Sequence, residues 1–461
     1  MVKDMTKGPP LKLILNFMLP LLLGNLIQQL YYLIDSVFVS VFVGPQSLAG
    51  LGVSSSIFFV VLGIVYGGCG GFGIIMAQKF GAKRKKGIKF AVAASLHLCV
   101  IFTIAITIAG LILTKPLLVF TKTPESVFNH AYIYTIITFA GTFSEIAYVL
   151  FAVILKSVGN NKTPLLFLVF CSVLDGILDY IMICIFNLST AGAALATVIA
   201  QTVSAILCLI LIIKKYKFLW PKKNEWKFKK HYFLAELKIG SPMGLQFAIT
   251  GIGIIFVQKA IDSFGENAIA GFTIAMKIED LVLTAFFALA TAIATFVGQN
   301  FGARKYHRIK EGAKAIVIIG LSFCFLFSLI VIVFWDQIIN LFAANKNTIP
   351  EAVKFEINNK AKQYINIAIF NFPILCLLIC FRSLIQAMGK SLIPFLTSFA
   401  ELLMRLIGAL VLAKLFGYVG VCWSPITAWY AAFIMVMASY FYTARKILKS
   451  NNKNTIEPNE I

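Results

Sequence analysis

The first half of the chain has three aspartate side chains deep inside long apolar stretches, where an ionised group is costly. Asp35 follows Gln28 and Tyr32 at helical spacing, and Asp175 and Asp179 are four residues apart, which places both on one helix face. An ionised side chain at the centre of a membrane helix costs about 2.5–3.5 kcal/mol. Because neighbouring negative charges oppose one another's ionisation, these carboxylates are expected to share protons or bind a monovalent cation. The alternative is that one of the three, foremost Asp175, faces a water-filled cavity without a role.

Other polar groups in the apolar stretches are candidates for lining a substrate cavity. The candidates are Gln28, Tyr32, Gln246, Thr250 and Glu279. A solvated cluster with Lys277 and Asp280 near the outer surface is the alternative for Glu279. Pro20 removes a backbone hydrogen bond inside an apolar run, so it is a candidate hinge, with a static kink as the alternative.

Two further groups are expected to have structural roles. Glu401 and Arg405 are four residues apart and are predicted to pair along one helix. Arg382 lies near the end of its apolar run and is predicted to extend toward the cytoplasmic surface.

Glu145 is a weaker candidate for lining the substrate cavity.

The composition requires a membrane setting for these groups. Of 461 residues, 59% are hydrophobic and 13% are charged, and the mean hydropathy is +0.89. A soluble domain of this size would carry far more surface charge. The net charge of +22 could indicate nucleic-acid binding. However, the basic residues gather in alternate loops, at the N-terminus, 79–89, 214–230, 304–308 and 445–449, and the positive-inside rule then places both termini in the cytoplasm.

The apolar stretches predict an all-α polytopic membrane protein with twelve transmembrane helices. A span needs about 20 mostly apolar residues. The predicted spans are 13–43, 50–78, 88–114, 131–157, 163–186, 190–213, 237–260, 268–298, 309–335, 361–388, 393–416 and 418–445.

The second half of the chain repeats the first. Gln78-Lys79-Phe80-Gly81-Ala82-Lys83 matches Gln299-Asn300-Phe301-Gly302-Ala303-Arg304, and Gly159 with Pro164 matches Gly389 with Pro394. Halves of six spans enter the membrane from the same side, so the repeat is parallel, with a pseudo-twofold axis along the membrane normal and a cavity between the halves. The predicted domains are an N-terminal six-helix lobe (1–213), a cytoplasmic linker (214–236), a C-terminal six-helix lobe (237–448) and a cytoplasmic tail (449–461).

The remaining reactive side chains do not indicate an enzyme. Nine cysteines lie in apolar runs without CxxC or Cys–His metal spacing, so buried free thiols are expected. Four scattered histidines, His97, His130, His231 and His307, match no catalytic or metal motif. We expect no cleavable signal, because the first apolar run lacks a small-residue cleavage site.

Taken together, these motifs resemble the multidrug and toxic compound extrusion (MATE) transporters. The resemblance covers residues 4–448 and rests on Asp4–Gly8, Leu19-Pro20, Asp35–Val39, Leu48–Gly52, Gln78–Ala82, Leu155–Pro164, Asp175–Asp179, Gly192–Thr197, Gln299–Ala303 and Glu401–Arg405. It implies a V-shaped pair of lobes working by alternating access.

The resemblance also implies a cation site in the first lobe. In the bacterial and archaeal branches it consists of an Asp, an Asn, an Asp and a Thr, and Asp35, Asp175, Asp179 and Thr197 occupy those positions. Asp175 departs from the usual Asn, which leaves the choice of Na+ or H+ open. The match to a second-lobe Glu of another branch is Thr250, so that site is expected to be missing.

The resulting prediction is a secondary active exporter of organic cations, drugs or other amphiphiles, driven by Na+ or H+ entry. A lipid or lipid-linked oligosaccharide flippase of the same superfamily is the alternative. We expect no cofactor beyond the coupling ion, a possible Na+ at the four first-lobe residues as the only metal, and no nucleic-acid partner. The expected setting is a monomer in the cell membrane, contacting the lipid bilayer and a small amphiphilic substrate.

Overall fold

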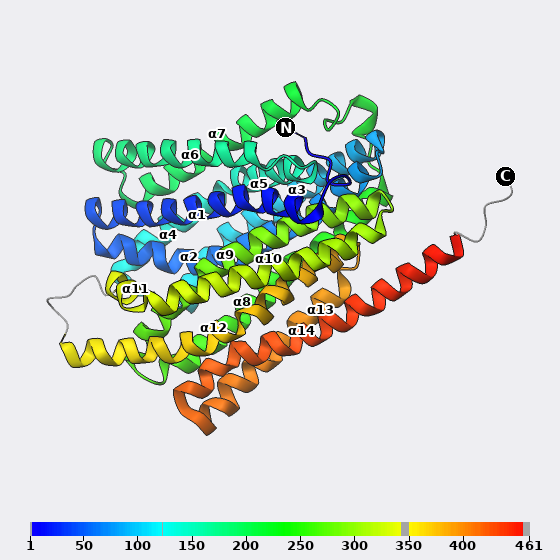
Figure 1. Cartoon of the computed structure of the whole chain (residues 1–461). Helices are drawn as coiled ribbons and strands as arrows, with labels where there is room; N and C mark the ends of the chain where they lie inside the picture. Colours follow the sequence, from blue (N-terminus) through cyan, green and yellow to red (C-terminus); the bar gives the residue numbers. More distant parts are fainter. Residues whose placement is uncertain (1, 122, 343–349, 455–461) are drawn as a thin grey trace. The chain divides into compact units, whose positions relative to one another are not determined.

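The computed structural model describes residues 2–121, 123–342 and 350–454, with side chains described except at 31–37, Pro45, Ser56, 340–342 and 446–454. Asp35 and Tyr32 therefore lie on a described helix, but their side chains are outside the described set. Figure 1 shows the helices in chain order.

The described residues form helices joined by loops, with no strand among them. The first helices are α1 (Pro10–Phe42), α2 (Pro45–Gly81), α3 (Lys85–Phe120), α4 (Glu125–Ala140), α5 (Thr142–Ser157), α6 (Lys162–Asp179), the π-helical η1 (Tyr180–Ile185), α7 (Ser189–Lys215) and the short η2 (Lys223–Glu225). The remaining ones are α8 (Lys230–Asp262), α9 (Glu266–Gly302), α10 (Tyr306–Val333), α11 (Trp335–Phe342), α12 (Glu351–Ala387), α13 (Leu392–Ile407), the π-helical η3 (Gly408–Leu412) and α14 (Ala413–Asn454).

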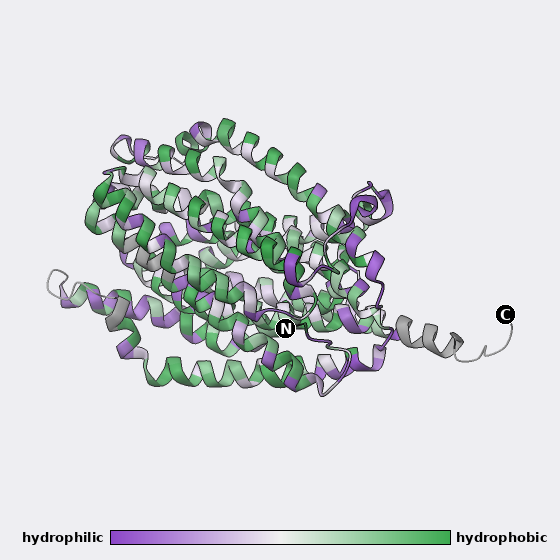
Figure 2. Cartoon of the chain, turned by 90° about the horizontal axis from the view of Figure 1, so that it is seen from above, coloured by the Kyte–Doolittle hydropathy of each residue, from purple (hydrophilic) through white to green (hydrophobic). Residues whose placement is uncertain are grey.

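These helices make the protein a multi-pass membrane protein. Within the described residues, 10 helices are long and apolar enough to cross a membrane, and the bent pair α4 and α5 raises the number to 11. The stretch Leu392–Arg445 contains two of the predicted spans, separated at Gly417, whose φ is 61°. The helices are hydrophobic over most of their length (Figure 2), and the prediction of an all-helical polytopic fold is confirmed.

The predicted span 131–157 consists of two helices. The chain bends by 49° between α4 and α5, at Gly141. A Cβ at Gly141 would lie 2.2 Å from a methyl carbon of Val198. The missing side chain therefore lets the bend approach α7 closely, and local hydropathy carries no sign of this tertiary contact.

The described chain divides into two compact units. The first unit contains Met1–Lys7 and Leu19–Ala248, and the second contains Gly8–Met18 and Ile249–Ile461. Helix α8 therefore begins in the first unit and continues into the second. In the first unit, buried residues of α2, α3, α5, α7 and the first part of α8 form one hydrophobic core. The predicted lobe boundaries at 213 and 237 stay a prediction.

The internal repeat is visible in the backbone of each unit. Lys83 and Arg304 have φ values of 56° and 57°, and Gly159 and Gly389 have φ values of 85° and 82°. Each pair occupies matched positions of the repeated motifs. A π-helical segment follows α6 in the first unit, and another follows α13 in the second. The same turns and the same helix irregularities therefore recur in both halves.

Candidate functional site

The predicted cation-coupling carboxylates lie at the end of α6. Asp175 and Asp179 are each 1% exposed, and Asp179 is the last residue of α6 before η1 begins. Their four-residue spacing is kept on a regular helix, so both belong to one face. Two buried carboxyl groups this close can hold a shared proton or attract a cation, because double ionisation without a counter-ion is unfavourable.

Thr197 belongs to α7, which packs against α6. It is half-buried, and its hydroxyl donates a hydrogen bond to the Ala193 carbonyl oxygen at 3.1 Å. The hydroxyl oxygen keeps lone-pair capacity in this arrangement. Its membership in a cation site with Asp175 and Asp179 stays a prediction.

The other first-unit candidates lie on α1 and α8. Gln28 and Pro20 are half-buried on α1, which runs as one helix through Pro20. Gln246 is half-buried on α8. Asp35, the fourth member of the predicted cation site, has its side chain outside the described residues, as does Tyr32. Their roles in cation coupling, the cavity and the hinge stay predictions.

Glu145 is a further buried carboxyl of the first unit. It lies in the first turn of α5, directly after the Gly141 bend, and is 7% exposed. The Tyr66 hydroxyl of α2 donates a hydrogen bond to its Oε1 at 2.7 Å. The carboxyl group is thus held by a neutral donor inside the helix bundle.

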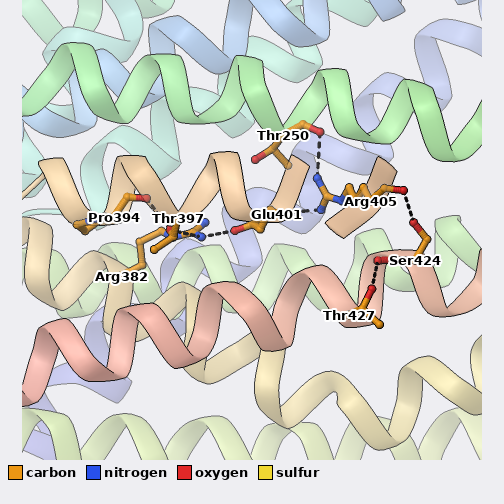
Figure 3. Close-up of polar contacts among 8 residues, drawn as sticks. All are labelled: Thr250, Arg382, Pro394, Thr397, Glu401, Arg405, Ser424 and Thr427. Carbon is orange, nitrogen blue, oxygen red and sulfur yellow. Dashed lines mark hydrogen bonds and ion pairs between the residues drawn. The ribbon is translucent and has the colours of Figure 1, made fainter. Parts of the chain in front are cut away.

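In the second unit, Glu401 lies in a network of ion pairs and hydrogen bonds (Figure 3). Glu401 of α13 forms an ion pair with Arg405, with Nη2 and Oε2 3.8 Å apart, which confirms the predicted pairing. It also forms a short ion pair with Arg382 of α12. Arg382 donates a second hydrogen bond to the Thr397 hydroxyl at 2.9 Å.

The prediction that Arg382 extends toward the surface is wrong. The residue is 7% exposed, and its guanidinium group is directed at Glu401. A buried carboxylate offers a guanidinium group a counter-charge and a planar hydrogen-bond partner, which compensates for the loss of water. The distant partner on α13 could not be read from the spacing around Arg382.

Arg405 occupies the repeat position of Asp175. Each lies eleven residues after its matched proline, Pro164 or Pro394. The Arg405 Nη1 atom donates to the Thr250 carbonyl oxygen of α8 at 3.1 Å. A Cβ at Gly253 would lie 2.8 Å from the Arg405 Cδ atom, so this glycine makes room for the side chain. The second unit therefore holds a fixed internal cation where the first unit holds carboxyl groups.

Glu279 of α9 is buried, at 5% exposed. The Tyr364 hydroxyl of α12 donates a short hydrogen bond to its Oε2 atom, and the Phe272 ring packs edge-on against Tyr364. Glu279 is therefore not part of a solvated surface cluster, which was the alternative interpretation. The proposed cavity roles of Glu279 and Thr250 stay predictions.

Sequence reasoning missed Glu236. The predicted linker ended at this residue, whereas α8 begins at Lys230 and Glu236 is 0% exposed. Leu234, Ala235, Leu237 and Ile239 surround it in the sequence. This apolar run was the available signal that the helix is already buried there.

No group of three or more His, Cys, Asp or Glu side chains is arranged to hold a metal ion within the described residues. The nine cysteines are free thiols, and eight of them are buried, as predicted.

A repeated multi-helix membrane fold with ionisable groups buried inside each unit defines the class of membrane transporters. The MatE family model matches residues 20–181 and 242–411, and the chain belongs to this family. The two matched segments carry the two copies of the repeat.

Curated relatives extend over most of the chain. It is 28% identical to a probable multidrug resistance protein, YpnP, of Bacillus subtilis, over 84% of this chain and 85% of the relative. It is 22% identical to the multidrug export protein MepA of Staphylococcus haemolyticus, over 90% of each chain.

Solved structures show the same fold. An outward-facing multidrug resistance MATE family transporter of the MOP superfamily has a TM-score of 0.87 at 22% identity, covering 96% of this chain and 98% of that one. A MATE structure in a bent conformation also has a TM-score of 0.87, at 21% identity, covering 97% and 98%.

Proposed function

We propose that this chain is a secondary active exporter of organic cations, drugs or other amphiphilic small molecules, driven by Na+ or H+ entry. The observation that carries the proposal is the pair of carboxyl groups, Asp175 and Asp179, on one buried face of α6. The multidrug resistance and export names of its relatives support the substrate class.

The coupling step follows from the electrostatics of that pair. When a proton or cation enters from outside, it neutralises the carboxyl groups and lowers the cost of keeping them away from water. When a cationic substrate approaches, the ionised pair attracts it instead. Because each ligand favours a different state of the same groups, binding of one promotes release of the other, which is the requirement for exchange. Asp35 and Thr197 would complete this site.

The flippase alternative fits the second unit less well. A lipid diphosphate needs basic side chains free to bind it. The buried Arg382 and Arg405 already share the Glu401 carboxylate, and Arg405 also binds the Thr250 carbonyl oxygen. These guanidinium groups are therefore engaged within the protein. The Glu401 network is more suited to holding α12, α13 and α8 together.

The rest of the proposal concerns the setting. We infer that the protein acts as a monomer in the cell membrane, with both termini in the cytoplasm and without a cofactor other than the coupling ion. The basic loops at 79–89 and 214–230 support this orientation, because Lys and Arg concentrate on the cytoplasmic side of membrane proteins.

The function is tested with purified protein in liposomes that contain an ethidium-like dye. Sodium and proton gradients are imposed separately, and dye movement is followed by fluorescence. We expect export under at least one gradient and only leakage without a gradient. Dye movement equal to that of protein-free liposomes under both gradients, together with transfer of a lipid-linked sugar, would favour the flippase instead.

The orientation gives a separate prediction. Single cysteines introduced in the loops 79–89 and 299–310 are expected to react with an impermeant maleimide from the cytoplasmic side only, because both loops follow an even number of predicted spans. Intact cells and inverted vesicles provide the two sides of the comparison. Labelling of the two loops from opposite sides would refute the parallel repeat.

A further inference from the structure

Glu236 is a buried carboxyl that the coupling site described above does not use. It lies on the part of α8 that belongs to the first unit, residues 230–248. Its side chain is 0% exposed, and Ile239, one turn later, is part of the first-unit core together with Phe72 of α2. Glu236 therefore points into protein rather than into a loop or a water-filled channel.

The surroundings of Glu236 do not compensate a negative charge. The Ser95 hydroxyl of α3 donates a hydrogen bond to Oε1 at 3.1 Å. Oε2 is buried without a hydrogen-bond partner in the described part of the chain, and no basic side chain there forms an ion pair with the carboxyl group. A single buried charge with one neutral donor is strongly unfavourable, whereas the neutral acid costs far less.

The titratable groups that face Glu236 are thiols. Cys69 of α2 and Cys99 of α3 lie beside it, and their sulfur atoms are 3.9 Å apart. On α8 itself, Lys238 is two residues further and exposed. None of these groups supplies a buried positive charge.

The basic groups near the start of α8 are engaged elsewhere. Lys79 lies over the Tyr232 ring, 5.4 Å from its centre. The His97 ring packs edge-on against Trp226, and Lys89 pairs with Glu225 at 3.0 Å. The carboxyl group is thus left without a cation from α2, α3 or α8.

Glu236 is enclosed by a glycine-lined contact between α2 and α8. A Cβ at Gly71 would lie 2.5 Å from the Gly240 Cα atom, and a Cβ at Gly67 would lie 2.8 Å from the Gly244 Cα atom. Such small residues, repeated every four positions, let helix backbones touch. At these positions the two backbones therefore approach closely, without side chains between them. Helix α8 continues into the second unit after Ala248, so this contact lies on a helix that both units share.

We propose that Glu236 binds a proton while α8 is packed on α2 and α3, and releases it to cytoplasmic water when this contact opens. On opening, the carboxyl O–H bond breaks, the proton passes to water and the carboxylate remains. On closing, the reverse reaction takes up one proton. Low pH thus favours the closed contact and high pH the open one. This proposal rests on the proposed function in one respect, because it assumes that the transporter alternates between conformations. It adds a second proton-binding site, separate from Asp175 and Asp179.

The test uses the full-length protein in lipid nanodiscs, without substrate or ion gradient. Cys69 and Cys99 serve as reporters, because they are 3% and 6% exposed in the closed contact. Their alkylation by a small maleimide is measured by peptide mapping between pH 6 and pH 9. In the wild type, exposure of these thiols should rise with pH by up to about tenfold per unit, the limit for one linked proton.

Two variants separate this effect from the titration of the thiols themselves. Glu236→Gln keeps a hydrogen-bond acceptor for Ser95 but cannot ionise. In this variant, labelling should increase with pH only as far as ionisation of the cysteine thiols themselves increases it. Glu236→Asp keeps a titratable group and should retain the wild-type pH profile. Gly240→Leu should give high labelling at all pH values and defines the open limit, because a side chain there would meet the Phe72 ring and the Gly68 carbonyl oxygen.

An infrared difference spectrum gives an independent readout. At neutral pH, the carbonyl band of a protonated carboxyl should be present in the wild type and weaker in Glu236→Gln. The same pH profile in wild type and Glu236→Gln, or no difference in this band, would overturn the proposal. This experiment does not measure dye export. A failure of the export assay in liposomes would therefore not change the labelling result, and a failure of the labelling experiment would not change the result of the export assay.

Discussion

Asp179→Asn is expected to lower gradient-driven dye export to the level of protein-free liposomes. Asp179 ends α6 where the helix widens into η1, and it is 1% exposed. The amide cannot exchange a proton or attract a cation as a carboxylate does. The folded fraction, followed by size-exclusion chromatography, should stay close to that of the wild type, because removing a buried charge relieves a desolvation cost.

Asp175→Asn is the matched comparison on the same helix face. Two neighbouring carboxyl groups release their protons in steps that belong to the pair, and the variant reduces the pair to a single acid. We expect export to continue, with a shifted pH optimum or an altered sodium dependence. An unchanged pH profile and ion dependence in this variant would mean that Asp175 is hydrated and independent of Asp179. Full export by Asp179→Asn would remove the pair from the coupling mechanism.

Glu401→Gln is expected to give the largest loss of stability in the second unit. The substitution leaves Arg382 and Arg405, which are 7% and 6% exposed, without their shared counter-charge. Removing one partner of a buried ion pair typically costs about 3–5 kcal/mol. The variant should therefore unfold at a clearly lower temperature in detergent, as measured by intrinsic fluorescence or differential scanning calorimetry.

Glu351→Gln is the control for this substitution. Its carboxylate also pairs with a basic residue, Lys354 at 3.6 Å, but the Glu351 side chain is 95% exposed. Such surface pairs contribute about 0–1 kcal/mol, so the melting temperature should barely change. Equal effects of the two substitutions would show that the Glu401 network does not stabilise the unit. Partial recovery in the double variant Glu401→Gln, Arg382→Gln would support it, because coupled residues are not additive.

The membrane fold could be predicted from the sequence because its signals are local. Runs of apolar residues of spanning length mark the helices, and Gly159 and Gly389 mark turns whose positive φ angles favour glycine. The pairing of Glu401 with Arg405 followed from a four-residue spacing on one helix. In each case, the residues that determine the structure are neighbours in the sequence.

The features that were not predicted have contact partners on other helices, although for Glu236 the neighbouring apolar residues indicated burial. Arg382 forms its ion pair with Glu401, which lies on another helix. The bend at Gly141 packs against Val198 of α7. Glu236 is enclosed by α2 and α3, more than a hundred residues earlier. For the predicted cation site, the four-residue spacing predicts that Asp175 and Asp179 lie on one face of a helix. Asp35 and Thr197 belong to other helices, so sequence spacing does not predict their positions relative to this pair.

The most direct test of exchange runs the transporter backward, with the substrate as the driving force. Purified protein is placed in liposomes with a dye gradient and no ion gradient, and proton and sodium movements are followed with an internal pH dye and radioactive sodium. The wild type should move one of these cations against the direction of the dye, and Asp179→Asn should move none. Dye transport by the wild type without any opposing cation movement would contradict the proposed exchange.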